Sequence, residues 1–225
     1  LNQMQVHDTN FYGLSAQSLG NDKGSLLIEE GIAVNSTASL DYSDAEAVKV
    51  LGNPTEGALL LWLKKAGVDY LNLRESAEVL EELPFSTERK YMATIVKSSL
   101  FEGKTILYVK GAPEIVSGLC KNIENNVSKT DIENQLVEYQ NQAMRTLGFA
   151  YQMFDGKADV FKDGKVVADN LTFMGVVAIS DPVRLDVPAA VAECMNAGIN
   201  VKIVTGDTPG TAKEIGRQIG LWTAK

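Results

Sequence analysis

Lys110 is the residue of this sequence best placed to bind an anion. It follows a β-rich run at 105–109 and precedes Gly111, Ala112 and Pro113. Gly and Pro suit the exit from a strand, and Pro113 suits the first turn of a helix. A lysine where a strand gives way to a helix can serve a binding site, because ammonium groups make strong charge-assisted hydrogen bonds to phosphate oxygens.

Other short segments combine Gly, Pro, Thr and charged residues in a similar way. They are Gly-Asn-Pro-Thr-Glu-Gly at 52–57, Pro-Phe-Ser-Thr-Glu-Arg-Lys at 84–90, Arg-Thr-Leu at 145–147, Asp-Pro-Val-Arg at 181–184 and Thr-Gly-Asp at 205–207. The first mimics half of a P-loop, but Ala58 and Leu59 stand where Lys and Ser or Thr must reach the phosphates and Mg²⁺. The sequence has no Gly-x-Gly-x-x-Gly dinucleotide motif either. A phosphate site must therefore be assembled from residues far apart in the sequence.

In this order and at these intervals, the segments resemble the cytoplasmic ATP-binding region of P-type cation-transporting ATPases, most closely the calcium-pump branch. The resemblance covers nearly the whole chain. It implies ATP as substrate, Mg²⁺ as a cofactor of the full-length enzyme, and a cytoplasmic domain of an integral membrane protein. The implied partners are ATP or ADP and the remaining phosphorylation, actuator and transmembrane domains of the parent chain.

The resemblance also assigns a residue to each part of ATP. Phe85 matches the ring on which adenine stacks, and Glu56 matches the carboxylate that accepts from the adenine amino group. Lys90, Lys110 and Arg145 match the basic positions of the family, and Gly111 adjoins Lys110. Among them, Lys110 is nearer the base and Arg145 is nearer the phosphates. Without the resemblance, Phe85 would be interpreted as a ring of the core, and Glu56 as a charge that stabilises a helix N-terminus. The basic residues would be interpreted as solvated surface side chains.

One position departs from the family pattern. Thr87 stands where many calcium pumps carry a phosphate-contacting arginine. Arg89 lies two positions further on, and the sequence leaves open whether it makes that contact instead. The resemblance therefore leaves the phosphate contacts incomplete.

The catalytic half of the site is expected to lie outside this chain. In the family, an Asp within Asp-Lys-Thr-Gly-Thr accepts the γ-phosphoryl group, and residues 1–4 resemble the stretch that follows it. The chain begins without Met, so we read it as part of a longer protein in which that Asp precedes Leu1 and the Mg²⁺-holding Gly-Asp-Gly-x-Asn-Asp loop follows Lys225. With no catalytic residue and no metal site, it should bind ATP without hydrolysing it. The residues that match motifs lining the phosphorylation site are Asp181, Arg184, Thr205, Gly206 and Asp207.

Composition excludes several classes of function. The chain has 225 residues, of which 45% are hydrophobic and 22% charged, so it can bury the core of at least one large domain. Its formal net charge of −8 disfavours nucleic acids and anionic membranes, which are bound through clustered Lys and Arg. His7 is the only histidine, which excludes His-dependent triads and multi-histidine metal sites. Cys120 and Cys194 lack the spacing of a zinc site or a disulfide framework.

No apolar run approaches the about 20 residues needed to cross a bilayer. The longest, at 171–179, reads as a buried strand. We therefore expect no direct membrane insertion of this chain.

The elements that must position these segments fall into two unequal parts. Residues 1–178 are predicted to form an α+β nucleotide-binding domain, an antiparallel β-sheet with helices that cover one face. The predicted strands are 5–8, 26–34, 90–96, 105–110, 149–154 and 172–179. The predicted helices are 54–66, where Ala58, Leu59, Trp62 and Leu63 form an apolar stripe, and 131–145, which ends at Arg145.

Residues 179–225 are predicted to be part of a phosphorylation domain with an α/β, haloacid-dehalogenase-like pattern. A helix at 187–197, a strand at 199–204 and a helix at 209–220 follow one another. Thr205, Gly206 and Asp207 lie where open α/β sheets bind ligands, although they also suit a simple strand end and helix cap. A central strand without neighbours exposes unpaired backbone groups, so we expect this tail to be the weak part.

Three functions remain for comparison. The first is the ATP-binding part of a cation pump, with Ca²⁺ as the ion implied by the sequence at 52–60. The second is a stand-alone haloacid-dehalogenase-type hydrolase, which requires an Asp-x-Asp-x-Thr or Val run near the start of the chain; the sequence lacks one. The third is a non-catalytic nucleotide-binding domain.

Overall fold

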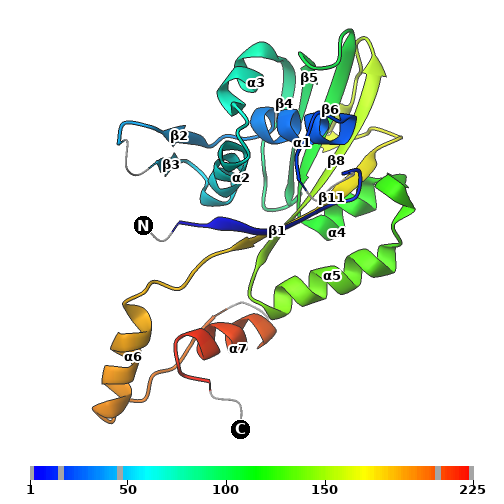
Figure 1. Ribbon diagram of the computed structural model, residues 1–225. Coiled ribbons are helices and arrows are strands. Elements are labelled where there is room, and N and C mark those ends of the chain that lie inside the picture. Colours follow the sequence, from blue (N-terminus) through cyan, green and yellow to red (C-terminus); the bar gives the residue numbers. More distant parts are fainter. Residues whose placement is uncertain (1–2, 15–17, 45–47, 206–208, 223–225) are drawn as a thin grey trace.

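A seven-stranded sheet forms the centre of the structure, a computed structural model that describes residues 3–14, 18–44, 48–205 and 209–222 (Figure 1). Its main path runs β1, β11, β8, β6, β5, β4 with antiparallel neighbours, and β7 pairs in parallel with β11. These strands are β1 (Gln5–Phe11), β4 (Glu78–Leu83), β5 (Tyr91–Lys97), β6 (Lys104–Gly111), β7 (Asn122–Ile123), β8 (Arg145–Asp155) and β11 (Thr172–Ser180). Two small antiparallel pairs are β2 (Ser39–Asp41) with β3 (Lys49–Leu51), and β9 (Phe161–Lys162) with β10 (Lys165–Val166). The predicted antiparallel α+β architecture is confirmed.

Helices cover both faces of this sheet, not one face as predicted. One face packs under α1 (Lys23–Val34), α2 (Pro54–Lys65) and α3 (Tyr70–Ser76). The other face packs under α4 (Pro113–Leu119) and α5 (Lys129–Asn141). A short 3-10 turn, η1 (Glu124–Asn126), precedes α5. Strand β6 shows the cause. Ile106 and Tyr108 belong to the core below α1–α3, whereas Leu107 and Val109 belong to the core below α4 and α5. Because both sets are apolar, both faces need a cover.

The predicted strand at 26–34 is wrong, because these residues lie in α1. Asp22 caps this helix by accepting a hydrogen bond from the backbone N–H of Ser25 at 3.1 Å. Most residues of α1 are buried, so apolar residues follow one another without the spacing of a one-sided helix. A buried helix and a buried strand then look alike in sequence.

Helix α2 follows the prediction closely and carries Glu56 in its first turn. Asn53 caps it, since its Oδ1 accepts from the backbone N–H groups of Thr55 and Glu56 at 2.9 and 3.3 Å. The predicted stripe of apolar residues packs into the core, with Leu59 and Leu63 buried. The cap and the stripe together fix the direction in which Glu56 points.

The second predicted helix ends earlier than expected. Helix α5 stops at Asn141, Ala143 adopts a left-handed backbone with φ of 58°, and Arg145 begins β8. The prediction that Arg145 closes a helix is therefore wrong. Strand β8 pairs with β6, so Arg145 still lies on the neighbour of the strand that bears Lys110.

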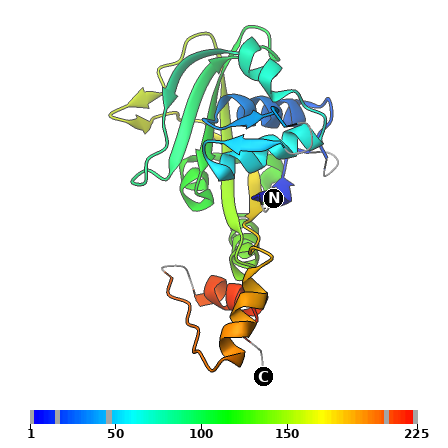
Figure 2. The ribbon, with the colours of Figure 1, turned by 90° about the vertical axis from the view of Figure 1, so that its left-hand side faces the viewer.

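The C-terminal part contains the two predicted helices but not the predicted strand between them. Helices α6 (Val187–Asn196) and α7 (Pro209–Gln218) lie below the sheet (Figures 1 and 2). Residues 199–204 form no strand, and Ile203 and Val204 are exposed. No strand of the described chain lies beside them to satisfy their backbone groups, which explains the wrong prediction. No helix of the described residues is long and apolar enough to cross a membrane.

Candidate functional site

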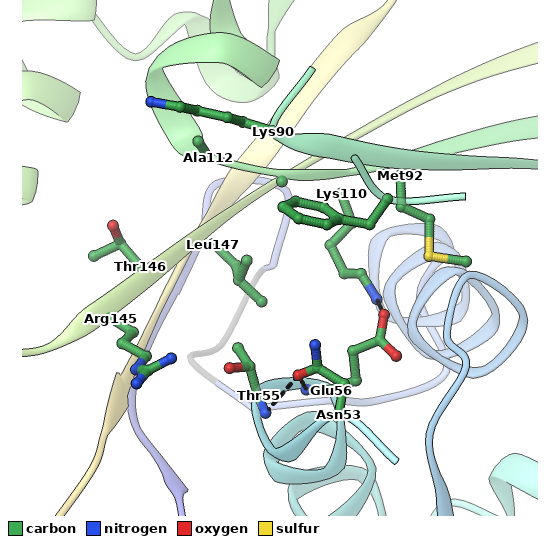
Figure 3. A pocket seen from close by; sticks show the side chains of 12 residues that line it. Asn53, Thr55, Glu56, Lys90, Met92, Lys110, Ala112, Arg145, Thr146 and Leu147 are labelled. Carbon is green, nitrogen blue, oxygen red and sulfur yellow. Dashed lines mark hydrogen bonds and ion pairs between the residues drawn. The ribbon is translucent and has the colours of Figure 1, made fainter. Parts of the chain in front are cut away.

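A cavity of about 420 Å³ opens where β5, β6 and β8 meet the start of α2 (Figure 3). Small-molecule sites usually measure roughly 300–1,000 Å³. The lining residues are Asn53, Thr55, Glu56, Phe85, Lys90, Met92, Lys110, Gly111, Ala112, Arg145, Thr146 and Leu147. All six residues predicted to bind the nucleotide are among them, so the structure brings together four segments that are distant in sequence.

Close backbone packing holds the β4–β5 connection against the end of β6. Lys90 has a left-handed backbone with φ of 59°, and its carbonyl accepts from the N–H of Ala112 at 2.9 Å. A Cβ on Gly111 would lie 2.3 Å from that carbonyl oxygen, so only glycine fits at this position. The connection that carries Phe85 and Lys90 is thereby fixed at the mouth of the cavity.

Glu56 and Lys110 form a buried ion pair at one side of the cavity. Lys110 Nζ lies 2.7 Å from Glu56 Oε1, and the two residues are 5% and 7% exposed. The ammonium group also donates to the backbone carbonyl of Asn35 at 2.6 Å. Figure 3 shows both side chains pointing toward each other from β6 and α2.

Burial and pairing act against each other on this ion pair. Burial alone raises the pKa of Glu56, but the charge of Lys110 and hydrogen bonds from Lys110 and Thr37 bring that pKa below its ordinary value. Burial lowers the pKa of Lys110, and Glu56 offsets part of this effect. Each group thus depends on the other for its charge.

Phe85 is the exposed aromatic residue of the cavity. It is 57% exposed and belongs to neither core cluster, so the interpretation of Phe85 as a core ring is wrong. Met92, which is buried, and Leu147 add apolar surface nearby. An exposed ring beside apolar neighbours offers a platform for a flat ligand.

The other side of the cavity carries solvent-accessible cations. Arg145 lies there, away from Glu56 and Lys110 (Figure 3). Its guanidinium lies 3.4 Å from Asp181 Oδ2, and both side chains are more than half exposed. Lys90 is exposed and forms no ion pair with any described residue. These groups can turn toward an anion at little cost, because an exposed ion pair contributes only about 0–1 kcal/mol.

Thr87 and Arg89 lie outside the cavity lining. Residues 87–89 form a turn. The guanidinium of Arg89 donates to the carbonyl of Pro84 and lies over the ring of Tyr91, 5.9 Å from its centre. In this arrangement the Arg89 guanidinium contacts Pro84 and Tyr91 and does not line the cavity.

The residues expected near a phosphorylation site are only partly brought together. Asp181 pairs with Arg145 and also lines a second cavity of about 480 Å³, beside Gln3 and Lys49. Arg184 pairs with Asp186 at 3.2 Å on the surface. Thr205 ends a described stretch, and Gly206 and Asp207 lie outside the described residues.

Several lining residues escaped the sequence analysis. Asn53 and Thr55 belong to the segment at 52–57, and Thr146 and Leu147 to the segment at 145–147, so these four had a signal. Met92 had none beyond its strand position. Within the described ranges, no cluster of three or more His, Cys, Asp or Glu is arranged to hold a metal ion.

Comparison with known proteins decides the family. A family model described as P-type ATPase, cytoplasmic domain N, matches residues 25–186, which is more than half of the chain. The chain belongs to this family. The resemblance inferred from the short polar segments is therefore confirmed.

Relatives of this N domain are named as calcium-transporting ATPases. Calcium-transporting ATPase PAT1 of Dictyostelium discoideum is 38% identical over 206 residues, which cover 88% of this chain and 18% of that protein. Calcium-transporting ATPase 2, plasma membrane-type, of Arabidopsis thaliana is 33% identical over 230 residues, covering 98% of this chain and 22% of that protein. Calcium-transporting ATPase 1 of Lactococcus lactis is 33% identical over 190 residues, covering 80% and 21%. The N domain thus spans about a fifth of the length of these relatives.

Proposed function

We propose that this N domain binds ATP in the 420 Å³ cavity and presents its γ-phosphate to an aspartate of the parent pump. The observation that carries the proposal is the convergence of six residues from four distant segments, including an exposed ring, a buried ion pair and two exposed cations, on one cavity. Each of these groups suits a different part of ATP.

Adenine is assigned to the end of the cavity that holds Phe85, Glu56 and Lys110. A base stacked on an aromatic ring gains about 1–3 kcal/mol. An ammonium group has three hydrogens, and two of those on Lys110 are taken by Glu56 and Asn35. The third hydrogen can be donated to a ring nitrogen of the base, and a lone pair on Glu56 Oε1 can accept from the adjacent amino group. Adenine presents such an acceptor and donor side by side.

The phosphates are assigned to Lys90 and Arg145. Charge-assisted hydrogen bonds from these cations to phosphate oxygens each contribute about 1.5–3 kcal/mol when partly desolvated, and less where the groups are as exposed as they are here. Gly111 serves by its lack of a side chain, which lets the backbone lie close to Lys90.

The wider role rests on the relatives. Their names support a calcium-transporting pump as the parent, and the family description supports a cytoplasmic location. We propose the transmembrane, actuator and remaining phosphorylation domains of that pump as partners. We further propose that residues 1–178 are the N domain proper and that 179–225 belong to the phosphorylation domain. Alone, the chain is proposed to bind ATP without turnover. Mg²⁺ is proposed as a cofactor of the full-length pump only, and no step is assigned to it here, because no group of three or more His, Cys, Asp or Glu among the described residues is arranged to hold a metal ion.

Titration calorimetry of the chain with ATP and ADP tests the proposal. We expect a Kd on the order of 0.1–1 mM, or roughly −4 to −5.5 kcal/mol. No response to about 10 mM of either nucleotide would overturn it. Phosphate release from ATP above the buffer rate would overturn the proposed lack of turnover.

A further inference from the structure

A turn outside the cavity holds both members of the buried ion pair. This turn, residues 35–38, follows α1, and none of its residues lines the cavity. Arg74 of α3 fixes it at both sides, because its guanidinium donates to the carbonyls of Ala33 at 2.9 Å and Ala38 at 3.0 Å. The turn is therefore a rigid support.

Donors of the turn use the full hydrogen-bonding capacity of one oxygen of the Glu56 carboxylate. Oε2 accepts from the backbone N–H of Thr37 at 2.8 Å, from Thr37 Oγ1 at 2.8 Å and from the backbone N–H of Ala38 at 3.2 Å. An oxygen with two lone pairs is saturated by three donors. Only Oε1, the oxygen that pairs with Lys110, remains available to a ligand in the cavity.

The same turn aims the lysine. The carbonyl of Asn35 accepts from Lys110 Nζ, and the Asn35 side chain is anchored to the sheet. Its Oδ1 accepts from Thr94 Oγ1 at 2.9 Å, and its Nδ2 donates to the carbonyl of Tyr108 at 3.4 Å. Carboxylate and ammonium are thus both held from one side, which leaves one acceptor and one donor facing the cavity.

We propose that the 35–38 turn is the positioning element for base selection in this domain, and that the Thr37 hydroxyl sets the orientation in which Glu56 meets the amino group of adenine. This inference rests on the proposed ATP binding. Thr37 is a positioning residue, because it acts through Glu56. Without its hydroxyl, Oε2 keeps the two backbone donors of Thr37 and Ala38 and a longer contact of 3.4 Å from Ser36 Oγ. One of its two shortest hydrogen bonds is then lost, and the carboxylate can rotate away from the ligand.

The test compares Thr37→Val with Thr37→Ser for binding of ATP and of inosine triphosphate. Valine has the shape of threonine without the hydroxyl, and serine keeps the hydroxyl. Inosine carries an oxygen where adenine carries its amino group, so it cannot donate to Glu56 at that position. We expect Thr37→Val to weaken ATP binding by about three- to tenfold, with inosine triphosphate changed by less than about twofold, and Thr37→Ser to retain the preference of the parent chain.

The outcomes are separable. If the unmodified chain binds ATP but Thr37→Val keeps the same preference for ATP, or weakens both nucleotides equally, the positioning role is refuted while ATP binding stands. If the unmodified chain does not bind ATP, the proposed function fails and this inference fails with it. Thr37 is exposed, so thermal unfolding of both variants should match the parent chain and exclude a folding defect.

Discussion

Phe85→Ala gives the most direct test of how the cavity binds its ligand. The ring is 57% exposed in the free domain. Taking about 200 Å² for a phenylalanine side chain, about 110 Å² of ring is open, and a base stacked on one face covers roughly half of that. At about 25 cal/mol per Å², the variant loses roughly 1.5 kcal/mol of binding, or about tenfold in Kd.

Folding should be almost unaffected by the same change. Phe85 belongs to neither core cluster, and exposed substitutions usually alter stability by no more than about 0.5 kcal/mol. Leu80→Ala is the matched control, because Leu80 is also a half-exposed apolar residue but lies on β4 away from the cavity lining. Calorimetric titration with ATP and urea unfolding of both variants separate binding from folding.

The refuting result is specific. If Phe85→Ala binds ATP within about twofold of the parent chain and of Leu80→Ala, the ring is not the platform for the base. If Phe85→Ala also unfolds at a much lower urea concentration, the ring contributes to packing in solution. A weaker ATP affinity would then reflect the lost stability as well as lost stacking.

Three further predictions concern the ion pair, the phosphate end and the tail. Lys110→Met leaves the buried Glu56 carboxylate without its partner and should lower the free energy of unfolding, measured in urea, by about 3 kcal/mol. Adding Glu56→Gln should restore most of that stability. A Lys110→Met variant as stable as the parent chain would contradict the pairing argument. Thr87→Arg adds a cation on the turn between Phe85 and Lys90 and should tighten ATP binding about three- to tenfold at low salt; tightening of adenosine by the same factor would exclude a phosphate contact. Deleting residues 181–225 should leave ATP affinity within about threefold, or about 0.65 kcal/mol, because the cavity lining precedes Asp181; a loss beyond about tenfold would mean that the tail helps to build the site.

The acid sensitivity of the fold follows from the same ion pair. The pKa of Glu56 is lowered in the folded chain, so its contribution to stability is present above the unfolded value, about 4.3, and is lost as pH falls through the folded value. In Lys110→Met, the pKa of Glu56 rises because the neighbouring charge is gone. Ionised Glu56 then contributes less stability than in the parent chain, so acidification should cost this variant less stability than it costs the parent chain.

The sequence predicted which residues meet at the cavity better than it predicted the elements that carry them. Gly111 and Pro113 placed Lys110 at the end of β6, and Asn53 and Pro54 placed Glu56 in the first turn of α2. These residues act locally, through backbone conformation and capping, so their effect can be read without the rest of the chain. Arg145 was brought near Lys110 for the wrong reason, since it begins a strand rather than ending a helix.

Elements that depend on distant partners were predicted poorly. Residues 26–34 are mostly apolar because α1 is largely buried, and even Glu30 is buried, so no local pattern separates this helix from a strand. Residues 199–204 have the composition of a strand, but a strand also needs a hydrogen-bonded neighbour. The described chain provides none.

The 35–38 turn escaped prediction for a deeper reason. Two of its four contacts to Glu56 Oε2 and its contact to Lys110 are made by backbone groups, which every residue type except proline carries in full. Side chains at given spacings can be recognised in a sequence, so Glu56 and Lys110 could be found there, but the groups that hold them could not. Only the hydroxyls of Ser36 and Thr37 leave a trace in the sequence, and serine and threonine are common in turns for other reasons.

The two ends of the cavity differ in how far they are organised before a ligand arrives. At the proposed base end, Glu56 and Lys110 are buried and fixed by six hydrogen bonds, five with the 35–38 turn and one with each other, so little side-chain entropy remains to be lost on binding. At the phosphate end, Lys90 and Arg145 are exposed, and each must give up rotamer freedom and Arg145 its pair with Asp181. Base recognition should therefore dominate the affinity of the isolated domain. Under the proposed function, the phosphate contacts gain strength only where another domain covers that end and removes water, and the same covering would accompany transfer of the γ-phosphate.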